Sequence, residues 1–129
     1  FGAVGAGTAY KLTVNLMGSV QIAATAEGML IAEKAGLDRD LVALALSKGA
    51  AASPQVVRNA KRMAENNHES DIAFPAAWRL KDTLYGLALA EKVGQDAPFG
   101  RVAGKDFEKT VEDGFGKLSE SKVIDILRS

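Results

Sequence analysis

Apolar side chains recur at helical spacing along almost the whole chain. No stretch alternates apolar and polar residues over the length of a strand, and no Asn-Gly or Asp-Gly turn lies between two strand-like runs. The pattern therefore predicts an all-α fold, with about six helices in a single domain.

Capping residues and helix breakers locate the ends of these helices. Gly36 stands where the first helix is expected to end, Asp38 is expected to cap the second, and Ser53-Pro54 provides a hydroxyl cap followed by proline in the first turn. The helices are expected at approximately 5–35, 38–49, 53–66, 75–94, 98–114 and 120–127. A polar loop is expected at 67–71, between the third and the fourth helix.

The first helix is expected to be unusually long, about 45 Å for roughly 30 residues. Its small residues let other helices approach closely: Gly18, Ala23, Ala24, Ala26 and Gly28. We therefore expect the other helices to pack around it. The apolar surface of the helix over 75–94 is expected to come from five large residues: Trp78, Leu80, Leu84, Leu87 and Leu89.

Composition and charge exclude several classes of protein. Lys plus Arg equals Asp plus Glu at 16 each, so the net charge is zero, and a broad nucleic-acid-binding surface is not expected because such surfaces need clustered basic charge. The longest uncharged run, 12–26, is too short and too polar for a membrane span. We therefore expect neither a nucleic acid nor a membrane as a partner.

Cysteine and histidine are nearly absent. The chain has no cysteine and a single histidine, His68, so we expect no disulfide and no metal site. His68 lies in the polar loop, where we expect it to be exposed and without a chemical role. The lack of cysteine fits a reducing compartment, and we expect a cytoplasmic protein. Because the chain starts at Phe1 rather than at methionine, we expect it to be part of a longer polypeptide.

The glycines near the start raise the question of a phosphate-binding loop. The segment GAGTAY at 5–10 carries the first two glycines of the G-x-G-x-x-G dinucleotide fingerprint, but Tyr10 occupies the third position, where glycine permits tight packing of helix on strand. Such a loop must also follow a buried strand, and only four residues precede Gly5. We therefore expect these glycines to relax the start of the helix and not to bind phosphate.

Two groups of residues are candidates for chemistry. Lys11 and Asn15 are four residues apart and project from one face of the first helix. The pair can belong to a functional site, or Lys11 can simply reach solvent near the start of its helix. Spacing alone leaves these two interpretations open. The second group is Phe74, Lys81 and Asp82. Lys81 and Asp82 are neighbours in the chain, so their side chains cannot point in one direction. One of them can face a functional cleft, and the alternative is an exposed charged pair on an amphipathic helix.

Taken together, these motifs resemble the C-terminal helical domain of the β-hydroxyacid dehydrogenases, the family of 3-hydroxyisobutyrate dehydrogenase, tartronate semialdehyde reductase and glyoxylate/succinic semialdehyde reductase. Residues 5–15 are similar to the family motif G-x-G-x-x-x-K-x-x-x-N, and AEGMLIAEKAGLD at 26–38 is similar to the family's helix end and following cap. The family's phenylalanine, eight residues before the aspartate of a Lys-Asp pair, corresponds to Phe74, Lys81 and Asp82. The resemblance spans nearly the whole chain and implies a fold like the C-terminal domain of 6-phosphogluconate dehydrogenase.

The resemblance implies an NAD(P)-dependent enzyme that interconverts a small β-hydroxyacid and its semialdehyde or oxo acid. Lys11 would be the catalytic lysine, giving a proton to the carbonyl oxygen in reduction and accepting it in oxidation, and Asn15 would bind the substrate or orient the lysine. Lys81 would reach the cofactor, while Phe74 and Asp82 would line or support the substrate site.

The resemblance also implies that NAD or NADP is bound mainly by an N-terminal Rossmann domain, which these 129 residues do not include. The chain would then pack against its own Rossmann domain and form a homo-oligomer. We expect the chain alone to show no appreciable turnover.

Some positions depart from the family pattern, and two other interpretations stay open. Val14 stands where many members have a second asparagine, and Thr83 where leucine is common, so the hydroxyacid stays unidentified. The alternatives are a non-catalytic helical interaction module with the same fold, and a related reductase of an imine or a phosphorylated sugar acid. Imine-reducing relatives lack the lysine, so Lys11 favours the hydroxyacid dehydrogenase.

Overall fold

The computed structural model describes residues 5–128, and within this range the chain is helical and forms no β-strand. The α-helices are α1 (Ala6–Lys34), α2 (Arg39–Lys48), α3 (Pro54–Glu65), α4 (Ala76–Lys92), α5 (Pro98–Thr110) and α6 (Val123–Leu127). Two short turns complete the fold, the π-helical turn η1 (Val111–Phe115) and the 3₁₀ turn η2 (Glu120–Lys122). The predicted all-α fold is confirmed.

The helix ends follow the capping signals in the sequence. Gly36 has φ +84°, the left-handed conformation that glycine adopts without strain, directly after α1. The carboxylate of Asp38 accepts a hydrogen bond from Leu41 N at 3.0 Å, and Ser53 Oγ accepts one from Val56 N at 3.2 Å. The end of the fifth helix differs from the prediction, because the α-helix stops at Thr110 and a π-helical turn continues to Phe115.

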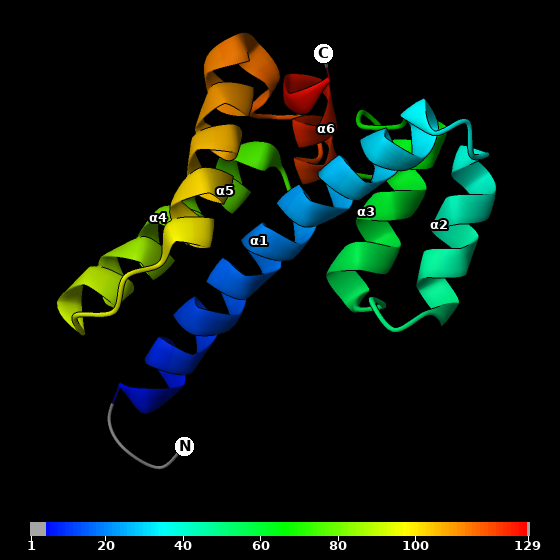
Figure 1. The fold of residues 1–129 in the computed structure, drawn as a ribbon. Coiled ribbons are helices and arrows are strands. Elements are labelled where there is room, and N and C mark those ends of the chain that lie inside the picture. Colours follow the sequence, from blue (N-terminus) through cyan, green and yellow to red (C-terminus); the bar gives the residue numbers. More distant parts are fainter. Residues whose placement is uncertain (1–4, 129) are drawn as a thin grey trace.

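Helix α1 crosses the whole molecule, and the other helices pack along it (Figure 1). Helices α2 and α3 lie at its C-terminal half, while α4 and α5 lie on its other side. The core between them is formed by apolar side chains of α1, α3, α5 and α6: Ile22, Ala26, Met29, Ala60, Met63, Phe107, Val123 and Ile124. Within residues 5–128 no helix combines the length and the hydropathy that a membrane span requires.

The buried face of α4 agrees with the prediction only in part, since Leu80 packs against the core and Leu87 lies against Gly100 of α5. Trp78 and Leu84 are 59% and 49% exposed, whereas the buried residues of this helix are Ala76, Arg79, Thr83 and Gly86. The cause is a close helix crossing, because a Cβ added to Gly86 would lie only 2.8 Å from Leu16 Cβ. Small and polar residues therefore face α1, and the leucines flank the contact.

His68 is buried, and the expectation of an exposed loop residue was wrong. Its side chain is 1% exposed, Nδ1 lies 2.7 Å from Ser121 Oγ, and Nε2 is buried without a hydrogen-bond partner among the described residues. The segment after η1 covers this loop, since Ser119 N donates to His68 O at 2.9 Å. Burial lowers the pKa of His68 below its ordinary value of 6.5, although the nearby carboxylate of Asp125 acts in the opposite direction.

Candidate functional site

Lys11 and Asn15 lie on the N-terminal half of α1. The helix begins directly after Gly5, which has φ +84°, so Gly7 and Tyr10 belong to its first turns and form no phosphate-binding loop. Lys11 is exposed, and among residues 5–128 its ammonium group has no hydrogen bond or ion pair. Asn15, one turn further on, is half-buried at the edge of the contact with α4.

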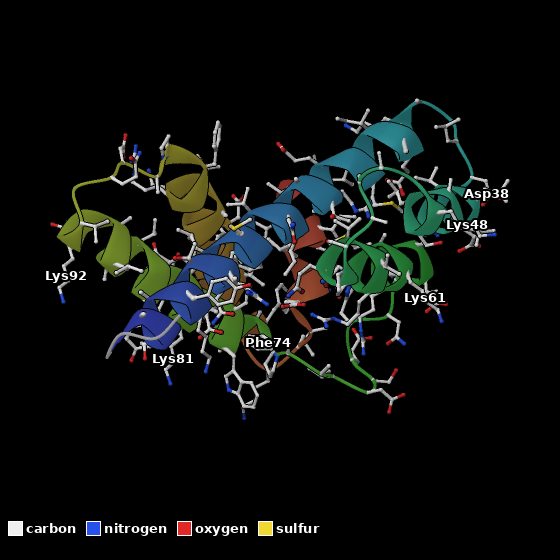
Figure 2. All side chains as sticks on the ribbon, turned by 90° about the horizontal axis from the view of Figure 1, so that it is seen from below. Asp38, Lys48, Lys61, Phe74, Lys81 and Lys92 are labelled. Atoms are coloured by element: carbon white, nitrogen blue, oxygen red, sulfur yellow. The ribbon has the colours of Figure 1, made fainter. Side chains whose placement is uncertain are left out.

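Phe74 directly precedes the cap of α4, and Lys81 and Asp82 lie in the second turn of that helix. The half-buried ring of Phe74 makes an edge contact with Trp78, with centroids 5.8 Å apart and an interplanar angle of 90°. Lys81 is exposed, with Nζ 6.0 Å from the centre of the Tyr85 ring, whereas Asp82 is half-buried, so the two neighbours do point in different directions. Figure 2 shows Phe74 and Lys81 at the α4 side of the molecule, far from Lys48 and Lys61 on α2 and α3.

The packing of α4 on α1 brings the backbone of Asn15 into contact with Arg79, whose guanidinium also lies over the Phe74 ring. Arg79 Nη1 donates to the backbone carbonyl of Asn15 at 3.1 Å, and the hydroxyls of Ser19 and Thr83 are 2.6 Å apart. Ser19 lies against Thr83, whereas Leu12 and Leu16 lie against Gly86, so the two helices run antiparallel. Lys11 is therefore one turn further from the Phe74 end than Asn15, and no hydrogen bond or ion pair among the described residues joins it to Phe74, Lys81 or Asp82.

The surface around Lys81 is hollow and mostly apolar. A shallow depression of about 390 Å³ is lined by residues of α4 only: Ala77, Leu80, Lys81, Leu84 and Tyr85. It combines one cation with an aromatic ring and aliphatic side chains. A larger groove of about 570 Å³ runs between α1 and the segment 95–100, but it holds none of the site residues that the sequence predicts.

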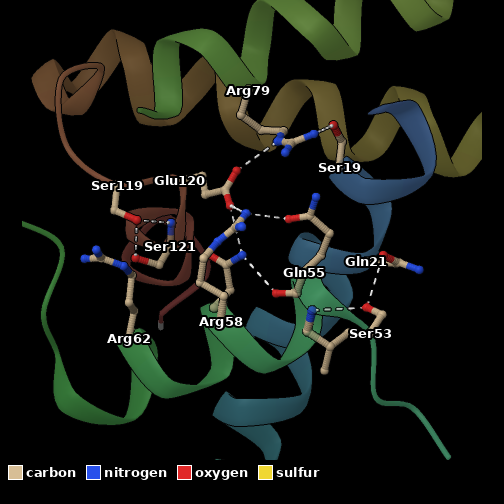
Figure 3. Close-up of polar contacts among 12 residues, drawn as sticks. Ser19, Gln21, Ser53, Gln55, Arg58, Arg62, Arg79, Ser119, Glu120 and Ser121 are labelled. Carbon is tan, nitrogen blue, oxygen red and sulfur yellow. Dashed lines mark hydrogen bonds and ion pairs between the residues drawn. The ribbon is translucent and has the colours of Figure 1, made fainter. Parts of the chain in front are cut away.

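A buried polar cluster, which the sequence analysis missed, joins α3, α4 and η2 (Figure 3). Its centre is the carboxylate of Glu120, which is 1% exposed and accepts hydrogen bonds from Arg58, Asn59 and Arg79. The signal in the sequence was weak, since Arg79 looks like one more charged residue of an amphipathic helix. Only its spacing from Thr83 and Gly86 marks it as part of the small and polar face.

Comparison with known proteins gives consistent similarities. A family model described as "NAD-binding of NADP-dependent 3-hydroxyisobutyrate dehydrogenase" matches residues 5–127. Over 128 residues the chain is 32% identical to glyoxylate/succinic semialdehyde reductase 2, chloroplastic, of Arabidopsis thaliana. That alignment covers 99% of this chain and 35% of the plant protein, so the chain spans about a third of that relative's length.

Two solved structures share the fold. A 3-hydroxyisobutyrate dehydrogenase from Salmonella typhimurium superposes with a TM-score of 0.88 at 25% identity, over 95% of this chain and 42% of the other. The Mycobacterium tuberculosis 3-hydroxyisobutyrate dehydrogenase, in a structure with L-serine, superposes with a TM-score of 0.84 at 27% identity. In that case 97% of this chain and 44% of the other are covered.

Proposed function

Because the chain belongs to the family of the NAD-binding region of 3-hydroxyisobutyrate dehydrogenases, we propose that it is the lysine-bearing C-terminal domain of an NAD(P)-dependent dehydrogenase. The complete enzyme interconverts a small β-hydroxyacid and its semialdehyde or oxo acid. The relatives are named for glyoxylate, succinic semialdehyde and 3-hydroxyisobutyrate, and one structure contains L-serine, so the proposed substrates are short acids with an oxygen function near the carboxylate.

The observation that carries this proposal is the exposed ammonium group of Lys11. Among residues 5–128 it has no hydrogen-bonding or ionic partner, so its charge and its donors are available to a ligand. Asn15 lies on the same helical face and can supply an amide donor and an acceptor.

Lys11 is proposed to handle the proton of the reaction. A lysine side chain is protonated at neutral pH and can donate a proton to a carbonyl oxygen as that oxygen becomes an alkoxide. In the oxidative direction the neutral amine accepts the hydroxyl proton. The positive charge of Lys11 also stabilises the negative charge that develops on the oxygen. Asn15 is proposed to hold the substrate or the lysine in place by hydrogen bonds.

The residues around Lys81 are proposed to contact one edge of a nicotinamide cofactor. Lys81 offers a cation for a phosphate or carboxamide oxygen, and the neighbouring Leu84 and Tyr85, 49% and 53% exposed, offer flat apolar contact area. When bound, the nicotinamide supplies or accepts the hydride. Phe74 and Asp82 are proposed to line or support the substrate side next to it.

The rest of the site is proposed to come from outside these residues. The chain spans 35% to 44% of the relatives it matches, and we propose that an N-terminal Rossmann domain supplies most of the cofactor contacts. We therefore expect no turnover from the chain alone. We also propose a homo-oligomer, since the face of α1 that carries Tyr10, Val14, Met17 and Ile31 leaves these side chains 42% to 70% exposed.

The experiment is a substrate panel on the full-length protein that contains this chain. Glyoxylate and succinic semialdehyde are offered with NADH or NADPH, and 3-hydroxyisobutyrate and L-serine with NAD⁺ or NADP⁺. Lys11→Ala is expected to reduce kcat about 10²- to 10⁴-fold, the usual contribution of a general acid–base group. Lys48→Ala removes an exposed lysine of α2 and is the matched control, expected to change nothing. Activity that survives in Lys11→Ala would contradict the proposal, and so would absence of activity with the whole panel.

A further inference from the structure

We infer that Arg79 is a positioning residue, anchored by Glu120, that holds the Asn15 side of the site at a fixed distance from the Phe74 side. The inference rests on the proposed function, because that function gives Asn15 and Phe74 their roles. Arg79 is 2% exposed, so it lies behind the surface of the site and acts through the residues that it contacts.

Arg79 contacts both parts of the site directly. Its Nη1 donates to the backbone carbonyl of Asn15 at 3.1 Å and lies 3.4 Å from Ser19 Oγ, on the next turn of α1. Its guanidinium carbon lies 4.6 Å from the centre of the Phe74 ring. One side chain from α4 therefore joins the helix that bears Lys11 and Asn15 to the aromatic residue that precedes α4.

Glu120 holds this side chain in a single orientation. Arg79 Nε donates to Glu120 Oε1 at 3.0 Å, while Arg58 Nη2 and Asn59 Nδ2 donate to Oε2 at 2.7 and 3.0 Å (Figure 3). Glu120 is itself tied to the site, because its backbone N donates to Phe74 O at 2.9 Å. A buried carboxylate needs such partners, and its full set of donors leaves Arg79 little freedom to move.

The chemistry of arginine makes this role specific. A guanidinium is a rigid planar fork whose nitrogens point in different directions, so Nε can bind Glu120 while Nη1 binds Asn15. A lysine carries the same charge on one nitrogen and cannot make both contacts while it also stacks on Phe74. Buried ion pairs often add little to net stability, so the fixed geometry is the consequence that matters here.

The test compares two lysine substitutions around the same carboxylate in the full-length protein. Arg79→Lys and Arg58→Lys each keep the charge and each disturb one guanidinium contact with Glu120, but only Arg79 contacts Asn15 and Phe74. The turnover number kcat and the Michaelis constant KM are measured with the best substrate of the panel. The temperature is one at which circular dichroism shows every variant to be fully folded. Arg79→Lys is expected to reduce kcat/KM about 10- to 100-fold, because a shift of about 1 Å in a reacting geometry costs up to about 100-fold. Arg58→Lys is expected to stay close to the wild type.

The outcomes separate this inference from the proposed function. If Lys11→Ala is inactive while both lysine variants keep wild-type kcat/KM, or lose it equally, Arg79 has no positioning role and the proposed function stands. If Lys11→Ala keeps its activity, the proposed function fails and this inference fails with it. If Arg79→Lys does not fold, Glu120→Gln takes its place, since it keeps the side-chain length and both arginines. Wild-type kcat/KM in that folded variant overturns the inference.

Discussion

The contact between α1 and α4 predicts different effects on stability for the same substitution at two glycines. Gly28→Ala places a methyl group on the exposed face of α1, where an added Cβ has no neighbour within 4 Å. Gly86→Ala places it 2.8 Å from Leu16 Cβ and 3.2 Å from the carbonyl oxygen of Leu12. Ordinary carbon–carbon contacts are about 3.5–4.0 Å, and neither partner atom can rotate away, so the two helices must separate.

The magnitude follows from two terms. Replacing glycine by alanine inside a helix stabilises the folded state by about 1 kcal/mol, and this gain is common to both variants. Overpacking at Gly86 costs about 1–3 kcal/mol, so Gly86→Ala should be less stable than Gly28→Ala by about 1–3 kcal/mol. Urea unfolding followed by circular dichroism measures this difference directly, and the melting temperatures should differ by about 3–5 °C per kcal/mol. A Gly86→Ala variant as stable as Gly28→Ala would refute the close crossing of the two helices.

Three further predictions concern the core, a cap and the buried histidine. Phe107→Ala should lower the free energy of unfolding by about 3–5 kcal/mol because Phe107 is 0% exposed, whereas Phe99→Ala, at a side chain 76% exposed, should change it by less than about 0.5 kcal/mol in the same urea experiment. Ser53→Ala should cost about 1 kcal/mol because it removes the oxygen that caps α3, and a thermal melt unchanged from wild type would count against that role. Burial lowers the pKa of His68, so the unfolded chain takes up a proton at higher pH than the folded one, and stability should be lost as the pH falls below about 6.5. His68→Asn should reduce this loss of stability between pH 7.5 and 5.5. Equal losses in the wild type and the variant would disprove that His68 causes it.

The sequence identified most of the candidate site residues, but it did not predict which of them lie close together. Spacing placed Lys11 and Asn15 on one helical face, and resemblance singled out Phe74, Lys81 and Asp82. The roles of these residues remain predictions. Spacing along a helix says nothing about which helix packs beside it. The contact of Arg79 with the Asn15 carbonyl could therefore not be predicted from the sequence.

The burial of several polar residues also could not be predicted from the local sequence. Arg79, Glu120 and His68 belong to types that are usually exposed or half-exposed, and nothing local marks them as buried. Each is buried because a distant segment supplies its partners: Glu120 lies 41 residues from Arg79, and Ser121 lies 53 residues from His68. These partners come into contact only when the chain has folded.

The sequence by itself determined the helices and most of their ends, because hydrophobic period, capping side chains and left-handed glycines act within a few residues of one another. The π-helical turn after Thr110 was not determined in this way. It also determined that the fold is all-α, since no alternating pattern competes with the helical one. The tertiary structure alone decided which face of α4 is buried. Leucines predict an apolar face, but the small residues Thr83 and Gly86 let α1 approach so closely that they, and not the leucines, occupy the contact. Close packing between helices depends on the shapes of both partners, and one helix's pattern contains only half of that information.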